Sequence, residues 1–174
     1  MYKILIVDDE SIEREGISFL IEKYKLPLEV AQATNGKTAL EYMRTHPIDI
    51  LLTDVKMPQM DGLELARHTF EKYPDVRILV FSAYGEFEFA KKAMAAQAVS
   101  YLLKPIEVDE FQRVMAQILA RCDELAEKKK DEQQRGEEYR QQLLFRLVTG
   151  TGLGKAPITE EWFSGQTLCL LHVQ

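Results

Sequence analysis

Short apolar runs alternate with longer amphipathic segments through the first two thirds of the chain. The runs are continuously apolar, as in ILIV, ILL and ILVF, whereas a sheet with one face in water alternates apolar and polar residues. We therefore predict buried parallel strands joined by helices with right-handed crossovers. The predicted strands span residues 3–7, 28–33, 48–53, 76–81 and 99–103, and the helices span 11–24, 36–44, 61–73, 86–97 and a segment from 107.

The last predicted helix is longer than a five-strand domain requires. Apolar residues recur at steps of four and three from Phe111 to Leu125, which is the heptad spacing of a coiled coil. The same register becomes polar from Lys129 to Gly136 and is apolar again at Leu143. One interpretation is a solvated or frayed helix, and the other is a coiled-coil signalling helix with a weak centre. We expect one long helix and hold dimerisation through it as a hypothesis.

The pattern divides the chain into three parts. We predict a domain at residues 1–122, a helical linker at 123–150 that continues the fifth helix, and the truncated start of a second domain at 151–174. The glycine-rich stretch TGTGLG marks the break before the third part. We do not expect this part to form a domain alone, because about twenty residues cannot bury a core.

Composition and charge exclude several classes of function for this chain. A net charge of −6 argues against nucleic-acid binding by these residues, because such binding needs a basic patch. No stretch approaches the roughly 18 apolar residues of a membrane span, and the chain opens into a strand pattern without a leader. Cys122, Cys169, His46, His68 and His172 show no metal-ligand spacing. We expect a cytoplasmic protein with two free thiols and no membrane contact.

Polar residues follow the apolar strands at one edge of the predicted sheet. In the strand order 2-1-3-4-5 of a flavodoxin-like α/β fold, the first and third strands are neighbours, and ligands bind at the switch point between them. This order brings together the carboxylates of Asp8, Asp9 and Asp54, while Ser82 follows the fourth strand and Lys104 the fifth. Taken singly, Asp54 or Ser82 would be expected to cap a turn, and Lys104 would be an ordinary surface lysine.

The groups gathered at this edge suit phosphoryl transfer to a carboxylate. Two bare carboxylates ~4 Å apart repel by about 4 kcal/mol at an effective dielectric constant of 20. A divalent cation relieves this repulsion, and oxygen-only ligands favour Mg²⁺, while Lys104 supplies a second compensating charge. An acidic nucleophile, a hard metal, a lysine and a hydroxyl are the parts that such a reaction needs.

Four motifs at the strand ends resemble the signature of response-regulator receiver domains. They are VDDE after the first strand, TDVKMPQMDG after the third, FSA after the fourth and YLLKP after the fifth, in this order over residues 1 to about 122. The resemblance implies that Asp54 accepts a phosphoryl group from a sensor histidine kinase. It also implies Mg²⁺ as the cofactor, with Mn²⁺ as a substitute. Asp9 and Asp54 would bind the metal directly, Asp8 would act through water, and the backbone carbonyl of Lys56 would complete the set.

The resemblance also implies roles for the residues after the fourth and fifth strands. Lys104 and Ser82 would contact the phosphoryl group, and the small side chain of Ala83 would leave room for it. Ser82 and Tyr101 would form the pair that switches between two receiver states. The bond between Lys104 and Pro105 would be cis, which X–Pro bonds tolerate.

Three further sequence stretches concern the output domain of the protein. AYGEFEFAKKAM, YLLKPI and a long helix closing in LLFRLVTG resemble the receivers of YesN-type transcription regulators, which carry a C-terminal AraC-type helix-turn-helix domain. The resemblance implies an N-terminal fragment that binds DNA only through this absent domain. It implies signalling through the face formed by helix 86–97, strand 99–103 and the last helix, where Phe87 or Phe89 is exposed. A homodimer would form through this face or through the linker helix.

Three alternatives stay open. A phosphorylation-independent interaction module would leave the site unused, which the intact set of site residues argues against. A phosphohydrolase of the haloacid-dehalogenase type uses similar chemistry, but that family carries a DxD motif after its first strand, where this chain has DDE. A receiver could also feed an output that does not bind DNA. As a receiver, the chain would be no enzyme beyond its own phosphorylation and dephosphorylation.

Overall fold

A computed structural model of the chain describes residues 1–83 and 100–149. The predicted helix at 86–97, with Phe87 and Phe89, lies outside the described residues, as does the predicted third part of the chain after residue 150. The chain divides after Glu127 into two units, and the part of the last helix beyond this point is described by itself. The boundaries expected at residues 122 and 150 remain predictions.

Five parallel strands form one sheet in the order β2-β1-β3-β4-β5. This confirms the predicted flavodoxin-like fold class and strand order. The strands are β1 Tyr2–Val7, β2 Leu28–Ala33, β3 Ile50–Asp54, β4 Arg77–Ser82 and β5 Ser100–Leu103.

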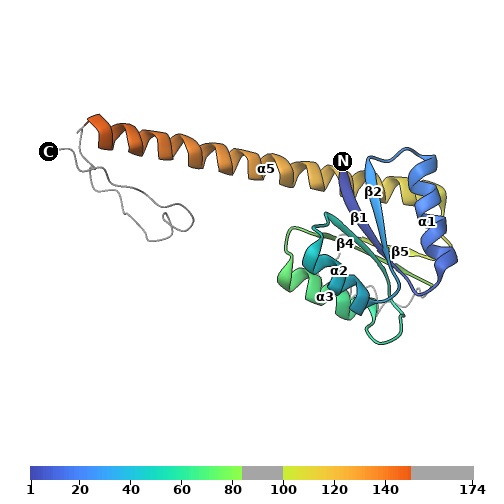
Figure 1. Ribbon diagram of the computed structural model, residues 1–174. Coiled ribbons are helices and arrows are strands. Elements are labelled where there is room, and N and C mark those ends of the chain that lie inside the picture. Colours follow the sequence, from blue (N-terminus) through green and yellow to red (C-terminus); the bar gives the residue numbers. More distant parts are fainter. Residues whose placement is uncertain (84–99, 150–174) are drawn as a thin grey trace. The chain divides into compact units, whose positions relative to one another are not determined.

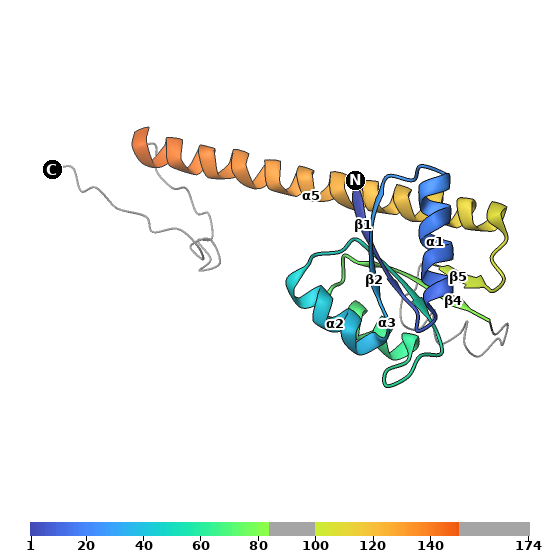
Figure 2. The same ribbon diagram turned by 45° about the vertical axis from the view of Figure 1, so that its right-hand side comes forward.

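Helices cover both faces of this sheet, which explains why its strands are continuously apolar (Figures 1 and 2). Successive strand residues point to opposite faces, so Leu5 and Val7 of β1 pack on one side and Ile4 and Ile6 on the other. The first side carries α2 and α3, and the second carries α1 and the start of α5. The helices are α1 Ser11–Lys23, α2 Gly36–Thr45, α3 Gly62–Lys72 and α5 Val108–Thr149.

Most elements differ from the predicted bounds by one or two residues, and at two of these ends a side chain bonds to the backbone. Asp61 precedes α3 as its N-cap, and its carboxylate accepts a hydrogen bond from the Glu64 backbone N–H at 2.7 Å. Strand β3 begins at Ile50 rather than at residue 48. Asp49 lies just before it and accepts the backbone N–H of Lys3 on its carboxylate at 2.7 Å.

The long final helix is confirmed, but its heptad pattern has a different cause from the one expected. Phe111, Met115, Ile118 and Cys122 are buried against the sheet. They belong to the core of the domain, so a coiled-coil seam has to begin after Cys122. The spacing of a helix face that packs on a sheet is close to that of a coiled coil, and the sequence pattern does not separate them.

A side-chain hydrogen bond ties the start of β1 to α5 at the end of this buried face. The Tyr2 hydroxyl donates to Asp123 Oδ1 at 2.6 Å, and this bond raises the pKa of Tyr2 to about 12. From Lys128 to Arg146 nearly all side chains of α5 are exposed to solvent. Within residues 1–83 and 100–149, we find no helix with the length and apolar character needed to cross a membrane.

Candidate functional site

The carboxyl ends of β1, β3, β4 and β5 lie at the same edge of the sheet. Val7 pairs with Thr53, so Asp8 and Asp54 each follow one member of this pair and lie at the same level of the sheet edge. Ser82 pairs with Leu103, which places Lys104 directly beyond the last rung between β4 and β5. Asp54 also pairs with Phe81 of β4, so the registers of these three strand pairs bring the predicted site residues to one place.

One ammonium group bridges two carboxylates at this edge. Lys104 Nζ lies 2.8 Å from Asp8 Oδ2 and 3.1 Å from Asp54 Oδ1. It also lies 4.7 Å from the centroid of the Phe81 ring, which supplies an apolar wall. The Lys104 side chain is 14% exposed and that of Asp8 only 2%. The three charged groups are thus largely removed from water, and the positive charge of Lys104 compensates the two carboxylates in part.

The second oxygen of each carboxylate accepts a backbone N–H two residues further along the chain. Asp8 Oδ1 accepts from the Glu10 amide at 2.8 Å, and Asp54 Oδ2 accepts from the Lys56 amide at 2.7 Å. Such side-chain bonds to the following backbone are typical of aspartates in turns. The two aspartates are therefore held in equivalent ways, one oxygen by Lys104 and the other by the local turn.

The protonation of Asp54 and Lys104 reflects this balance. Burial raises the pKa of Asp54, and the attraction of Lys104 offsets the rise only in part. Burial lowers the pKa of Lys104, but its bonds to Asp8 and Asp54 outweigh burial and leave this pKa raised. Burial therefore destabilises the ionised form of Asp54, whereas Lys104 stays protonated beside it. Further positive charge near Asp54 would be stabilising.

The carboxylates open onto a pocket of about 430 Å³. The predicted residues Asp9, Lys56, Ala83 and Pro105 line it together with Asp8, Asp54 and Lys104, and Glu10 and Glu13 add two further acids. The bond between Lys104 and Pro105 is cis, as the resemblance implied. The sequence prediction missed the two glutamates as pocket residues. Their positions one and four residues after Asp9, where the chain turns into α1, were the available signal.

The predicted switch residues do not line this pocket. Ser82 is fully buried at the end of β4, and its backbone carbonyl accepts the Lys104 N–H at 2.8 Å. Tyr101 is partly buried and packs against the core on the side of α2 and α3. Ser82 directly precedes Ala83 at the end of β4, and Tyr101 precedes Lys104 by three residues on β5.

The donor groups of the pocket suit a hard cation. In the described part of the chain, no three carboxylate, histidine or cysteine side chains are already arranged around a metal position. The available donors are carboxylate and carbonyl oxygens, which fit Mg²⁺ because this ion binds through one or two carboxylates and keeps several waters.

Gly62 is a structural residue of the site that the sequence prediction did not single out. A Cβ atom at this position would lie 1.7 Å from the backbone carbonyl oxygen of Asp54 and 2.7 Å from Thr53 Oγ1. The Gly62 amide also donates to the Val55 carbonyl at 2.9 Å. The start of α3 thus presses directly on the backbone that carries Asp54, and only glycine fits there. The sequence signal that could have identified Gly62 is its place in the motif MDG.

Replacing Lys104 with glutamine is expected to destabilise the fold by about 2 kcal/mol near neutral pH, since it leaves Asp8 and Asp54 as an unpaired buried pair. Without the lysine the pKa of Asp54 rises further, so the folded state binds a proton more tightly than the unfolded state. Stability then falls as pH rises through this raised pKa, and the loss is larger near pH 7 than near pH 5.

Urea unfolding at the two pH values measures this difference. Lys3→Gln is the control, because Lys3 forms a more exposed pair with Glu29 at 3.2 Å and such pairs contribute under about 1 kcal/mol. An equal loss for the Lys104 variant at both pH values would contradict the expectation.

Comparisons with known proteins point to one family. The model of the response regulator receiver domain matches residues 4–116. The transcriptional regulatory protein YesN of Bacillus subtilis (strain 168) is 41% identical over 121 residues, which cover 69% of this chain and 33% of that protein. The chain thus spans about a third of the length of this relative.

Two solved structures share both the fold and a recognisable part of the sequence. The receiver domain of AraT, a response regulator from Geobacillus stearothermophilus, is 38% identical with a TM-score of 0.65, and the match covers 74% of this chain and 98% of that one. A two-component transcriptional regulator AraC from Clostridium phytofermentans ISDg is 32% identical with a TM-score of 0.64, and the match covers 74% and 99%.

Proposed function

The chain belongs to the response-regulator receiver family, and from this premise we propose that Asp54 accepts a phosphoryl group from a sensor histidine kinase. The observation that carries the proposal is the environment of Asp54. Its carboxylate is buried, opens onto a pocket, and has Lys104 Nζ at 3.1 Å. Receiver domains are phosphoacceptors, and we propose no turnover of another substrate beyond phosphorylation and dephosphorylation of this chain.

In the proposed reaction, a carboxylate oxygen of Asp54 attacks the phosphorus atom of the donor. A bond forms between this oxygen and phosphorus, and the bond from phosphorus to the leaving nitrogen of phosphohistidine breaks. Asp54 is prepared for this role because the Lys56 amide and Lys104 hold its two oxygens in place. Lys104 then lies close enough to neutralise charge on the transferred group, and Ala83 leaves space beside it.

Receiver domains generally bind Mg²⁺ for this reaction, and the oxygen donors of the pocket fit that ion. We propose that Asp9 and Asp54 hold it directly, with Asp8 acting through water and the Lys56 carbonyl as a further ligand. Mn²⁺ is proposed to substitute. When bound, the ion supplies positive charge that stabilises the phosphoryl oxygens.

Phosphorylation would change the charge balance in the pocket. A phosphoryl group on Asp54 replaces the single carboxylate charge with roughly −1.5 to −2 charges, so Lys104 then has to balance Asp8 and a more strongly charged group at position 54. We propose that Ser82 moves to bond the phosphoryl oxygens and that Tyr101 follows, which shifts the population between two receiver states. The position of Ser82 directly before Ala83, and of Tyr101 on the strand that leads to Lys104, supports this role.

The proposal is tested by intact mass after incubation of the chain with acetyl phosphate. A single phosphate adduct is expected with Mg²⁺ present and none after the ion is removed with a chelator. Digestion should place the adduct on the peptide that contains Asp54. Absence of an adduct under every condition would favour a phosphorylation-independent interaction module.

We propose further that the full-length protein regulates transcription through a C-terminal DNA-binding domain, to which residues 151–174 would lead. The names of two relatives, a transcriptional regulatory protein and a two-component transcriptional regulator, support this output. The helical linker at 123–150 would connect the two domains. An output that does not bind DNA is the alternative, and the sequence of that domain would distinguish the two.

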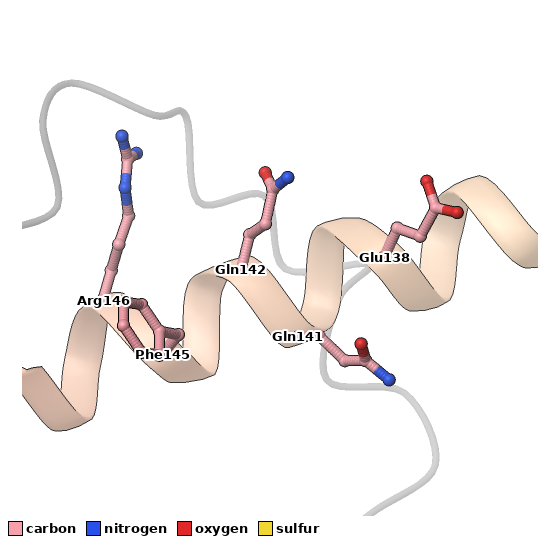
Figure 3. Close-up of a pocket in the computed structure, with 5 residues that line it drawn as sticks. All are labelled: Glu138, Gln141, Gln142, Phe145 and Arg146. Carbon is pink, nitrogen blue, oxygen red and sulfur yellow. The ribbon is translucent and has the colours of Figure 1, made fainter.

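The end of α5 is the proposed contact between two copies of the chain. Leu144 and Phe145 are 47% and 68% exposed, and Phe145 lies among polar residues of the same helix, Glu138, Gln141, Gln142 and Arg146, which line a pocket with it (Figure 3). Pairing of this segment in a dimer would remove its apolar side chains from water. Phe145→Glu is expected to weaken a dimer in sedimentation equilibrium. Gln133→Glu adds the same charge at an exposed position about three turns earlier on α5, and it is not expected to weaken the dimer. Equal effects of both variants would contradict this contact.

A further inference from the structure

Arg14, in the first turns of α1, holds the backbone at the end of β1. Its Nη1 donates to the Asp8 carbonyl oxygen at 2.7 Å, and its Nε donates to Gln32 Oε1 at 3.2 Å. The Gln32 amide donates to Ser18 Oγ at 3.0 Å, and the Ser18 hydroxyl donates to the Arg14 carbonyl at 2.7 Å. This closed network joins β1, α1 and β2 at the border of the acidic pocket.

The bond from Arg14 completes a full set of partners for Asp8. The Asp8 backbone N–H donates to Ala33 at 3.3 Å, and its two carboxylate oxygens accept from Glu10 and Lys104. The carbonyl oxygen is the remaining polar atom, and Arg14 binds it. A peptide group is planar, so a fixed Asp8 carbonyl also fixes the orientation of the Asp9 amide and the position of the Asp9 Cα atom that carries the side chain.

We propose that Arg14 is a positioning residue for the metal ligands of the pocket. By holding the Asp8 carbonyl, it orients the peptide between Asp8 and Asp9 and so places the Asp9 carboxylate relative to Asp54. This inference rests on the proposed function, in which Asp9 and Asp54 bind Mg²⁺. Residues that orient the ligands of a metal without touching it commonly change metal affinity by tenfold or more.

The direction in which Mg²⁺ affinity changes when Arg14 is replaced distinguishes a positioning role from a purely electrostatic one. Arg14 is a cation beside a pocket lined by five acids. If only its charge mattered, removing it would strengthen the binding of Mg²⁺, because repulsion between two cations would be relieved. If it positions Asp9, removing it weakens the binding of Mg²⁺ despite the more negative pocket.

The experiment measures Mg²⁺ affinity of the full chain by NMR titration, following the backbone amide of Glu10, with no phosphoryl donor present. Arg14→Gln is expected to weaken binding on the order of tenfold and to speed amide exchange of Glu10 in the metal-free protein. Arg14→Lys, which keeps the charge and a donor, should recover part of the affinity. Gln32→Leu leaves the net charge unchanged and should weaken binding by a smaller factor, because it frees Arg14 Nε.

Arg67→Gln is the matched control, because Arg67 lies on α3 in an exposed pair with Glu71 and its loss changes the net charge equally. Its Mg²⁺ affinity should equal that of the wild type. Unchanged or tighter binding in a cooperatively folded Arg14→Gln would overturn the inference. If that variant does not fold, unchanged binding in Gln32→Leu overturns it instead. Failure of the proposed function is a separate outcome, in which the wild type forms no Mg²⁺-dependent adduct on Asp54.

Discussion

Replacing Asp54 with asparagine is expected to abolish phosphoryl transfer to the chain and to leave the fold intact. The asparagine amide is a poor nucleophile, while its shape is nearly that of aspartate. Its carbonyl oxygen can still accept the Lys56 amide, and Lys104 keeps Asp8 as its partner at 2.8 Å. Because burial makes the charge of Asp54 costly, its removal should change stability by no more than about 1 kcal/mol.

Intact mass after incubation with acetyl phosphate and Mg²⁺ measures the loss of the adduct, and thermal unfolding followed by circular dichroism measures stability. Asp61→Asn is the matched control. Asp61 caps α3, and asparagine caps a helix as well as aspartate does, so this variant should form the adduct normally. An adduct that persists in Asp54→Asn would place the acceptor on another residue of the pocket, such as Asp8 or Asp9.

Replacing Gly62 with alanine is expected to destabilise the fold by about 3 kcal/mol or more, near the upper end of overpacking effects. The added methyl group would lie 1.7 Å from the Asp54 carbonyl oxygen, which is far inside contact distance. That oxygen is part of β3, which is paired with β1 and β4 on its two sides. Neither the strand nor the start of α3 can move without losing bonds, so the position of Asp54 and its phosphorylation rate should also suffer.

Urea unfolding and the rate of adduct formation measure the two effects. Gly136→Ala is the control, because nothing lies within 4 Å of a Cβ atom at this position of α5. In a helix interior, alanine is more favourable than glycine by up to about 1 kcal/mol, so this variant should gain stability and keep the normal rate. If Gly62→Ala unfolded at the same urea concentration as the wild type, the expected clash between its Cβ atom and the Asp54 carbonyl oxygen would be contradicted.

The family and the candidate site could be predicted from the sequence because both leave local signals. Runs such as ILIV and ILVF are buried on both sides, and each ends in a polar residue at the carboxyl end of its strand. Parallel strands have to expose these ends at a common edge. Asp8, Asp54 and Lys104 could therefore be placed together without coordinates.

The packing of α5 shows where a local signal was insufficient. The spacing of Phe111, Met115 and Ile118 predicts an apolar helix face, and this face exists. Whether it meets a partner helix or the sheet depends on residues far away in the sequence, such as Ile50 and Leu79 in the same core. A helical period specifies which side chains share a face, but not which surface that face covers.

The sequence by itself determined the strands, their parallel arrangement and the residues such as Asp8, Asp54 and Lys104 that meet at one edge, since apolar periodicity and motif spacing are properties of short segments. Only the tertiary structure decided the contacts between segments. Lys104 and Asp8 are 96 positions apart, Gly62 touches the backbone of Asp54, and Arg14 reaches the Asp8 carbonyl. These contacts depend on strand register and on distances of a few ångströms, which arise when the whole chain packs and leave no periodic pattern in the sequence.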